Sequence, residues 1–194
     1  TQYLHHRASN LRAADVPADW QAAPIAHLAP LDDEIDLAII EQLSDSFIGL
    51  TPQGLMRRWN DDGLVSRAEW RRAFEVLPAI HATVLSIEDI EGDWALADRW
   101  AGATRILVVT QAESGATFYF NGKRQPLPAP RVAVADPTGA GDLFAAAFFV
   151  RLRETDDVLT AGRFAIALAS ASVTRSGLAS LPSADEIEAA RALQ

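Results

Sequence analysis

Short apolar runs, rich in β-branched residues, alternate along this chain with longer stretches of helical period, and this alternation limits the fold more than any other feature. Strands that alternate with helices form layered α/β domains, in which each crossover makes successive strands parallel. We therefore predict an α/β fold with a mostly parallel sheet. The strands expected in the first half are Ile25–Leu28, Phe47–Leu50, Thr83–Ser86 and Ile106–Thr110. The helices expected between them are Ile35–Leu43, Arg67–Glu75 and Trp94–Ala101.

The second half of the chain begins with a hairpin pattern. The turn Asn121-Gly122 favours the primed turns that join antiparallel strands, so Thr117–Phe120 and Lys123–Leu127 predict an antiparallel edge. A last short strand is expected at Arg131–Ala135. The helix expected at Leu143–Arg153 is rich in Ala and Phe on all sides, which is typical of a helix buried between layers. Two further helices are expected, Val158–Arg175 with a glycine cap at Gly177, and Ala184–Leu193 with a Ser183–Glu186 capping box.

Composition narrows the range of functions. A length of 194 residues fits a single domain, and a formal net charge of −9 argues against nucleic acid as a partner, because gripping a phosphate backbone requires a basic surface. The chain has no cysteine, which is consistent with a reducing compartment, and we expect a cytoplasmic protein. The longest apolar run, Leu143–Val150, is far shorter than the roughly 20 residues of a membrane span, so we expect no membrane partner.

The sharpest local feature is Thr138-Gly139-Ala140-Gly141-Asp142, placed between a predicted strand and a long helix. Small residues let an anion approach the backbone, and the N–H groups of a first helical turn point towards it, so phosphate binding is the expected use. A carboxylate in that turn would repel a phosphate unless a hydroxyl group lay between the two. Asp142 is therefore a candidate general base for phosphoryl transfer to a hydroxyl group. The alternative is that Asp142 caps the helix and the glycines only form a tight turn.

The stretch Val134–Phe148 resembles the second signature of the ribokinase-like, or PfkB, carbohydrate kinases. The resemblance extends to Ile106–Ala116, which is similar to the strand and nucleotide loop of the family, and to Phe164–Pro182, which is similar to its later helix and glycine-containing loop. It implies a ribokinase-like, doubly wound fold for residues 1–194 as a single partial domain, the nucleotide-binding and catalytic-base half. The N-terminal part and the lid of the family have no counterpart in this sequence.

The resemblance also implies residue roles. Asp142 would be the catalytic base, and the amides of Gly139, Ala140 and Gly141 would form the anion hole. The positions that match the nucleotide site are Thr110, Ala112, Ser114, Gly115, Ile166 and Gly177. The positions that match an activating monovalent cation site, K⁺ in relatives, are Asp136, Thr138, Ser172, Arg175, Gly177 and Ser180. Glu88 and Asp89 lie where many relatives carry a motif linked to Mg²⁺, and are tentative substitutes for it through ordered water.

Three positions depart from the family pattern. Ala112 stands where relatives usually have Gly, which is tolerable only if that backbone does not need a positive φ. Ser86-Ile87-Glu88-Asp89 replaces the Mg²⁺-linked motif, and Ile166 replaces the Asn or His common near the adenine. The segment Gln53-Gly54…Arg57 resembles one in some sugar-kinase relatives, although a plain turn is the more common origin of such a sequence. The four histidines, His5, His6, His27 and His81, lack the spacing of a zinc site, and we interpret them as structural or surface residues.

Two hypotheses about function remain open at this stage. The first is an ATP-dependent kinase, with Mg²⁺ and K⁺ as cofactors, that transfers the γ-phosphoryl group to a hydroxyl of a sugar-like or nucleoside-like small molecule. The second is a catalytically silent nucleotide-binding or assembly module without an acceptor site. The chain does not begin with Met and lacks the substrate-contacting part of the family, so we expect it to be a fragment or a shortened protein. A bare sheet edge would favour pairing with a second copy, as a homodimer, or aggregation.

Overall fold

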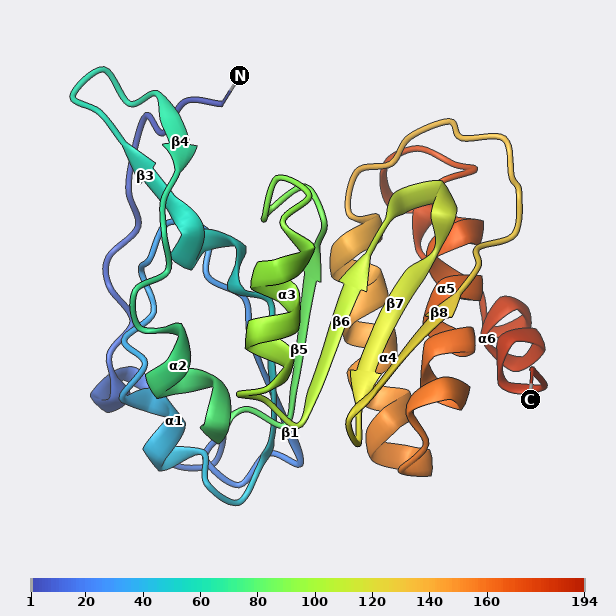
Figure 1. Ribbon diagram of the computed structural model, residues 1–194, viewed down its shortest axis with the longest axis horizontal. Helices are drawn as coiled ribbons and strands as arrows, with labels where there is room; N and C mark the ends of the chain where they lie inside the picture. Colours follow the sequence, from blue (N-terminus) through green and yellow to red (C-terminus); the bar gives the residue numbers. More distant parts are fainter. Residues whose placement is uncertain (1, 194) are drawn as a thin grey trace.

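The computed structural model describes residues 2–193, and its centre is a sheet of six strands in the order β1-β2-β5-β6-β7-β8 (Figure 1). The first four of these strands are parallel, and the last two form an antiparallel hairpin at one edge. Their bounds are β1 Ile25–Leu28, β2 Phe47–Leu50, β5 Ala82–Ser86, β6 Ile106–Thr110, β7 Ala116–Phe120 and β8 Lys123–Leu127. The mostly parallel α/β sheet with an antiparallel edge hairpin is therefore confirmed.

Helices cover both faces of the sheet. The α-helices are α1 Ile39–Gln42, α2 Ala73–Val76, α3 Trp94–Ala101, α4 Ala140–Thr155, α5 Val158–Ser172 and α6 Ala184–Arg191. Short 3₁₀ helices are η1 Ala13–Asp15, η2 Pro52–Met56, η3 Leu77–Ala79, η4 Ala112–Ser114 and η5 Gly177–Ser180. Between residues 2 and 193, none of these helices is long and apolar enough to cross a bilayer.

The alternation of side chains along β6 divides the core into two layers. Leu107 and Val109 pack with the residues of α1, α2 and α3, whereas Val108 points to the opposite face and packs with α4 and α5. On that second face α4 contributes the buried rings of Phe144, Phe148 and Phe149. The prediction that this helix lies buried between layers is confirmed for its sheet-facing side, although its other side is exposed at positions such as Ala146 and Val150.

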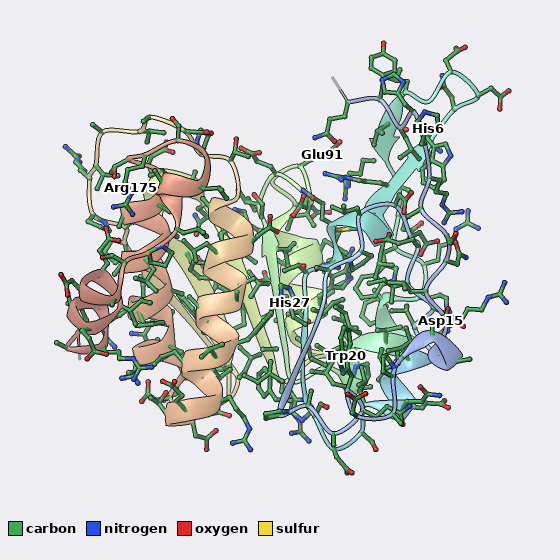
Figure 2. The ribbon with its side chains drawn as sticks, turned by 180° about the vertical axis from the view of Figure 1, so that it is seen from behind. His6, Asp15, Trp20, His27, Glu91 and Arg175 are labelled. Atoms are coloured by element: carbon green, nitrogen blue, oxygen red, sulfur yellow. The ribbon has the colours of Figure 1, made fainter. Side chains whose placement is uncertain are left out.

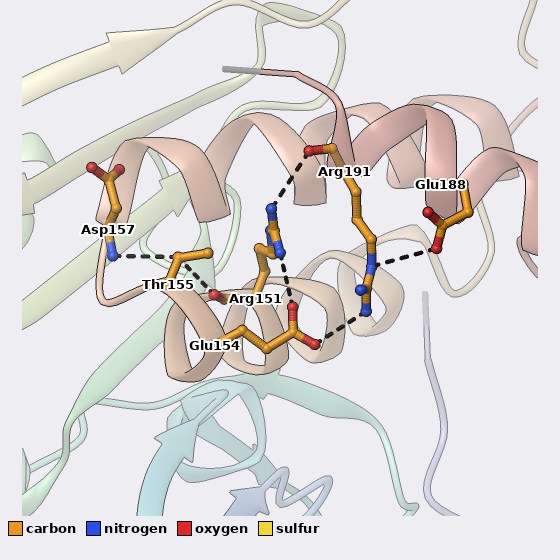
Figure 3. A network of polar contacts seen from close by, with 6 residues as sticks. All are labelled: Arg151, Glu154, Thr155, Asp157, Glu188 and Arg191. Carbon is orange, nitrogen blue, oxygen red and sulfur yellow. Dashed lines mark hydrogen bonds and ion pairs between the residues drawn. The ribbon is translucent and has the colours of Figure 1, made fainter.

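The hairpin turn and the cap of α6 form as the sequence predicts, whereas the predicted glycine cap of α5 is wrong. This helix ends at Ser172 with Val173 as its C-cap, and Gly177, with a φ of 58°, begins η5. Asn121 and Gly122 both have positive φ, 51° and 69°, as a primed turn requires. Ser183 and Glu186 form the expected capping box at the start of α6. The C-terminal half is further tied by a polar network in which Glu154 of α4 accepts hydrogen bonds from Arg151 (3.0 Å) and from Arg191 of α6 (3.1 Å), as Figure 3 shows.

The strand predicted before α4 and the first predicted helix differ in the structure. The strand expected at Arg131–Ala135 does not form, because this segment has no neighbouring strand and runs instead past the end of α5, where the Ala135 amide donates to the Val173 carbonyl (2.7 Å). The helix expected at Ile35–Leu43 shortens to α1, because Ile35 forms an isolated bridge with Leu11.

The prediction of a helix at Arg67–Glu75 is also wrong over most of that segment. Val65–Arg67 is strand β4, which pairs antiparallel with β3, Arg57–Trp59, in a separate two-stranded sheet. Gly63, with a φ of 79°, closes the turn between these strands. Only Ala73–Val76 is helical, as α2.

We predict that Gly49→Ala in β2 destabilises the fold by about 1–3 kcal/mol, as overpacking does in tight cores. A Cβ atom at Gly49 would lie 2.5 Å from the ring of Phe149, so α4 would have to shift away from the sheet. Urea unfolding followed by circular dichroism measures this effect. The matched control is Gly102→Ala, whose Cβ would meet no atom closer than the Arg99 carbonyl oxygen at 3.4 Å, and an equal loss in both variants would contradict the prediction.

Candidate active site

The glycine-rich loop lies where the sequence predicts, at the N-terminus of α4. Figure 1 shows the preceding segment, in gold, crossing over the end of the sheet at which β6 ends. Asp136 begins the turn, because its carboxylate accepts the amide hydrogen of Thr138 (2.9 Å). Gly139 has the left-handed φ of 79°, and α4 starts at the next residue. A Cβ atom added at Gly139 or Gly141 would meet nothing within 4 Å, so the space above the loop is open.

Three amides of the first turn are free to bind an anion. The Ala140 amide donates to the Pro137 carbonyl (3.2 Å), which occupies one of the three predicted anion-hole donors. The amides of Gly139, Gly141 and Asp142 have no protein acceptor among residues 2–193. Donors of this kind at a helix N-terminus, reinforced by the helix dipole, form an anion-binding site. The Asp142 amide is thus a donor that the sequence reasoning missed, although its first-turn position could have indicated it.

Asp142 presents its side chain to solvent at the same helix end. Its carboxylate has no hydrogen-bond partner in the described part of the chain. An acceptor molecule can therefore reach it, whereas a buried or paired carboxylate would have favoured the interpretation as a helix cap. The N-cap position itself is occupied by Gly139, whose residue type offers no side-chain cap.

His27, which the sequence analysis interprets as a structural or surface residue, is exposed at the end of the sheet where the strands of the candidate site end. It lies near the end of β1, and its Nε2 atom is 3.2 Å from the Thr51 hydroxyl oxygen just beyond β2. Packing around the ring lowers the pKa of His27, and the nearby negative charge of Asp142 acts in the opposite direction. The signal that could have identified His27 is its position, since ligands of parallel sheets bind at the carboxyl ends of the strands.

The predicted nucleotide loop follows β6 and is held by its own hydrogen bonds. The Gln111 amide donates to the Gly115 carbonyl (2.8 Å), and Thr110 donates through its hydroxyl to the Leu85 carbonyl (3.3 Å). Ala112 has a φ of 48°, a left-handed conformation that is unfavourable for alanine and accessible to the glycine that is usual at this position in the family. Ser114 is exposed and available to a ligand.

Two of the predicted nucleotide residues are buried. Gly115 has a φ of 93°, and a Cβ atom there would lie 2.1 Å from the Leu127 carbonyl oxygen, so this glycine is required by close packing against β8. Ile166 is 6% exposed and packs in the core between α5 and the sheet. Its contact with a nucleotide base, like the other nucleotide contacts, stays a prediction.

The residues of the predicted cation site lie around the turn after α5. Hydrogen bonds from the side chain and amide of Thr138, with one from the amide of Gly177, hold the pKa of Asp136 below its usual value. Ser180 donates to the Gly177 carbonyl (2.7 Å), and the buried Ser172 donates to the Ala169 carbonyl (2.8 Å). The structure therefore brings Asp136, Thr138 and Gly177 together, while the two serine hydroxyl groups already have protein partners.

A bidentate ion pair fixes this turn to the last helix. Arg175, labelled in Figure 2, donates to both carboxylate oxygens of Glu186 in α6, at 2.6 and 3.1 Å. Hydrogen bonds from Arg175, followed by one from the Ser183 amide, lower the pKa of Glu186 to about 2. The ion pair thus fixes the side chain of Arg175, the residue whose backbone carbonyl is a predicted cation ligand.

The acidic residues predicted to act with Mg²⁺ have different surroundings. Asp89 accepts hydrogen bonds from Gln53 (3.1 Å) and from the Ser86 amide (2.9 Å), which gives its carboxylate a structural role in the loop after β5. Glu88 is exposed. Among the described residues no group of three or more His, Cys, Asp or Glu side chains could hold a metal ion by itself.

We predict that Ala112→Gly stabilises the protein by about 0.5–1 kcal/mol. Glycine removes the left-handed strain of about 1–2 kcal/mol, and its greater conformational freedom in the unfolded chain cancels part of that gain. Thermal unfolding measures the gain. The matched control is Ala133→Gly in the extended segment before α4, where no gain is expected. A loss of stability in the Ala112 variant would show that the left-handed conformation is not adopted.

A model of the pfkB family carbohydrate kinases matches residues 83–185, just over half of the chain. The ribokinase of Bacillus subtilis is 39% identical over 83 residues, which cover 42% of this chain and 28% of that protein. A fructokinase of Rhizobium leguminosarum is 31% identical over 91 residues, again 42% of this chain and 28% of the relative.

The solved structures agree on the fold. The ribokinase of Thermotoga maritima matches with a TM-score of 0.74 and 20% identity, over 94% of this chain and 61% of the ribokinase. A pyrophosphate-dependent kinase in the ribokinase family, solved with a pyrophosphate analog and myo-inositol, matches with a TM-score of 0.81 and 21% identity, over 96% of this chain and 69% of that one. This chain thus spans less than two-thirds of the length of Thermotoga ribokinase. Because the family model matches more than half of the chain, including the predicted nucleotide loop and the loop before α4, the chain belongs to the pfkB family of carbohydrate kinases.

Proposed function

We propose that the protein is the catalytic-base half of a phosphotransferase that moves the γ-phosphoryl group of ATP to a hydroxyl of a sugar-like small molecule. The observation that carries this proposal is the exposed carboxylate of Asp142 in a helical turn whose Gly139, Gly141 and Asp142 amides are free. The family supports it, since relatives carry the names ribokinase and fructokinase. ATP as the donor and the identity of the acceptor belong to the proposal.

In this mechanism the chain supplies a base and a set of donors. The Asp142 carboxylate accepts a hydrogen bond from the acceptor hydroxyl and takes its proton as the oxygen attacks the γ-phosphorus. A new P–O bond forms on the acceptor, the bond to the β-phosphate oxygen breaks, and ADP leaves with that bonding pair. The free amides of the first turn of α4 stabilise the negative charge on the transferring group, because they are oriented before the reaction starts.

The residues present fit two cation roles. Asp136, with carbonyl groups from the turn after α5, offers the oxygen donors that a monovalent cation prefers, and Arg175 is fixed there by its ion pair with Glu186. Such a cation would supply positive charge beside the anion-hole loop. Mg²⁺ in phosphoryl transfer is held chiefly by substrate phosphates and water, so the exposed Glu88 is enough to fit it without a protein cluster.

We expect Asp142→Asn to lower turnover by about 100- to 10,000-fold, the usual contribution of a general base, while ATP binding survives. A coupled assay for ADP with ribose, fructose and myo-inositol as acceptors measures turnover, and calorimetry measures nucleotide binding. Pyrophosphate is included as a second donor, because a solved structure of the family carries that description.

The matched control for this variant is Asp156→Asn at the opposite end of α4, a left-handed position that Asn tolerates. Its turnover should equal that of the natural protein. Unimpaired turnover in the Asp142 variant would refute the assignment of the base. A natural protein that binds ATP and turns over no acceptor would instead favour the silent nucleotide-binding module.

A further inference from the structure

A hydrogen bond between two half-buried side chains joins the loop after β2 to the loop after β5. Gln53, in η2, donates through Nε2 to the Oδ1 atom of Asp89 (3.1 Å). The strands do not make this connection themselves, because β2 pairs with β5 only as far as Thr83, whereas β5 continues to Ser86. The side-chain bond therefore connects two loops that lie beyond the last backbone pair of their strands.

The backbone beside Gln53 has a fixed position. The Gly54 amide donates to the Pro30 carbonyl in the loop after β1 (2.9 Å). A Cβ atom at Gly54 would lie 2.3 Å from that carbonyl oxygen, so the two loops are in close contact there. Because such packing leaves little freedom to move, Gln53 offers its side-chain amide from a rigid support.

Asp89 closes the turn at the end of β5, in the green loop of Figure 1, and this turn carries the exposed Glu88. The second carboxylate oxygen of Asp89 accepts a hydrogen bond from the Ser86 amide (2.9 Å), and the Glu88 amide donates to the Ser86 hydroxyl oxygen (3.2 Å). On the side of β6, the Ile87 amide donates to the Thr110 carbonyl (2.9 Å). The turn thus has one anchor at the start of the predicted nucleotide loop and a separate one at Gln53.

A second contact joins the same loop to the β3–β4 hairpin. Arg67 of β4 lies 2.8 Å from the carboxylate of Glu91, but the Glu91 side chain is 68% exposed. Ion pairs this exposed contribute little, because water and salt screen them. A half-buried hydrogen bond to a charged acceptor is stronger, so the bond between Gln53 and Asp89 is the more important of the two ties.

We propose that Gln53 is a positioning residue: it holds Asp89, and through Asp89 it holds the turn that presents Glu88 to the Mg²⁺ of a bound nucleotide. This inference rests on the proposed function, in which Glu88 fits the Mg²⁺ role. Without Gln53, the Asp89 carboxylate keeps one donor, the Ser86 amide, and the turn must be ordered when the metal binds. Ordering a loop on binding costs affinity. The anchor at Thr110 remains, so binding of metal-free nucleotide should change little.

The test is calorimetry of ATP binding, with and without Mg²⁺, in the natural protein and in Gln53→Met. Methionine keeps an unbranched side chain of similar length and removes the donor. Mg²⁺ should strengthen ATP binding to the natural protein, and in the variant this strengthening should fall about threefold or more, with the Kd of metal-free ATP within about twofold. The matched control is Gln21→Met, which loses a hydrogen bond to the Val16 carbonyl (3.3 Å) before the amino end of β1 and should keep the natural effect of Mg²⁺.

A combined variant tests whether Gln53 acts through Glu88. Glu88→Gln should itself reduce the effect of Mg²⁺, and adding Gln53→Met should reduce it little further, because both changes act on the same carboxylate. Independent, additive reductions would overturn the proposal. So would an unchanged effect of Mg²⁺ in Gln53→Met, an equal weakening with and without the metal, or no strengthening by Mg²⁺ in the natural protein. Failure of the proposed base gives a different result, full turnover in Asp142→Asn, and leaves these binding measurements unaffected.

Discussion

The packing of α4 against the sheet is the constraint on which the candidate site depends. Phe144, Phe148 and Phe149 are all buried between this helix and the strands, and Phe149 lies over Gly49, where no larger residue fits. Because close-packed aromatic rings leave little freedom to slide or tilt, the helix has one position on the sheet. Its first turn is thereby held beside the carboxyl ends of the parallel strands, where His27 and Thr51 lie. The position of the candidate site is therefore set by a hydrophobic contact, that of Phe149 with Gly49, two helical turns from Asp142.

The proposed phosphate site does not require a basic surface, although the chain has a net charge of −9. The donors are main-chain amides at Gly139, Gly141 and Asp142, which carry no formal charge and need no Lys or Arg side chain. A carboxylate can then share the same helical turn, because a negative charge near a helix N-terminus interacts favourably with the helix dipole. The acid and the donors are held by one helix, so their relative position does not depend on a flexible loop.

The sequence predicted the elements that local patterns determine. Four parallel strands, the Asn121-Gly122 hairpin and α3 lie where apolar runs and turn residues place them, and Asp142 is exposed at a helix start as its motif indicates. The predictions that failed concern segments whose conformation is determined by contacts with residues distant in the sequence. Residues 131–135 have a strand composition but meet the end of α5, and Val65–Arg67 pairs with β3 in place of the predicted helix.

The candidate site also combines features that local sequence determines with features that distant contacts determine. A glycine-rich loop before a helix can be identified from sequence, because its chemistry is local, whereas the contact of His27 with Phe149 of α4 joins residues more than a hundred positions apart. The measurement that tests the central claim most directly is a titration of the isotope-labelled protein with ATP and Mg²⁺, followed by amide NMR. The account predicts that the largest shifts occur at the amides of Gly139, Gly141 and Asp142. Binding that leaves these three signals in place, with shifts elsewhere, would contradict it.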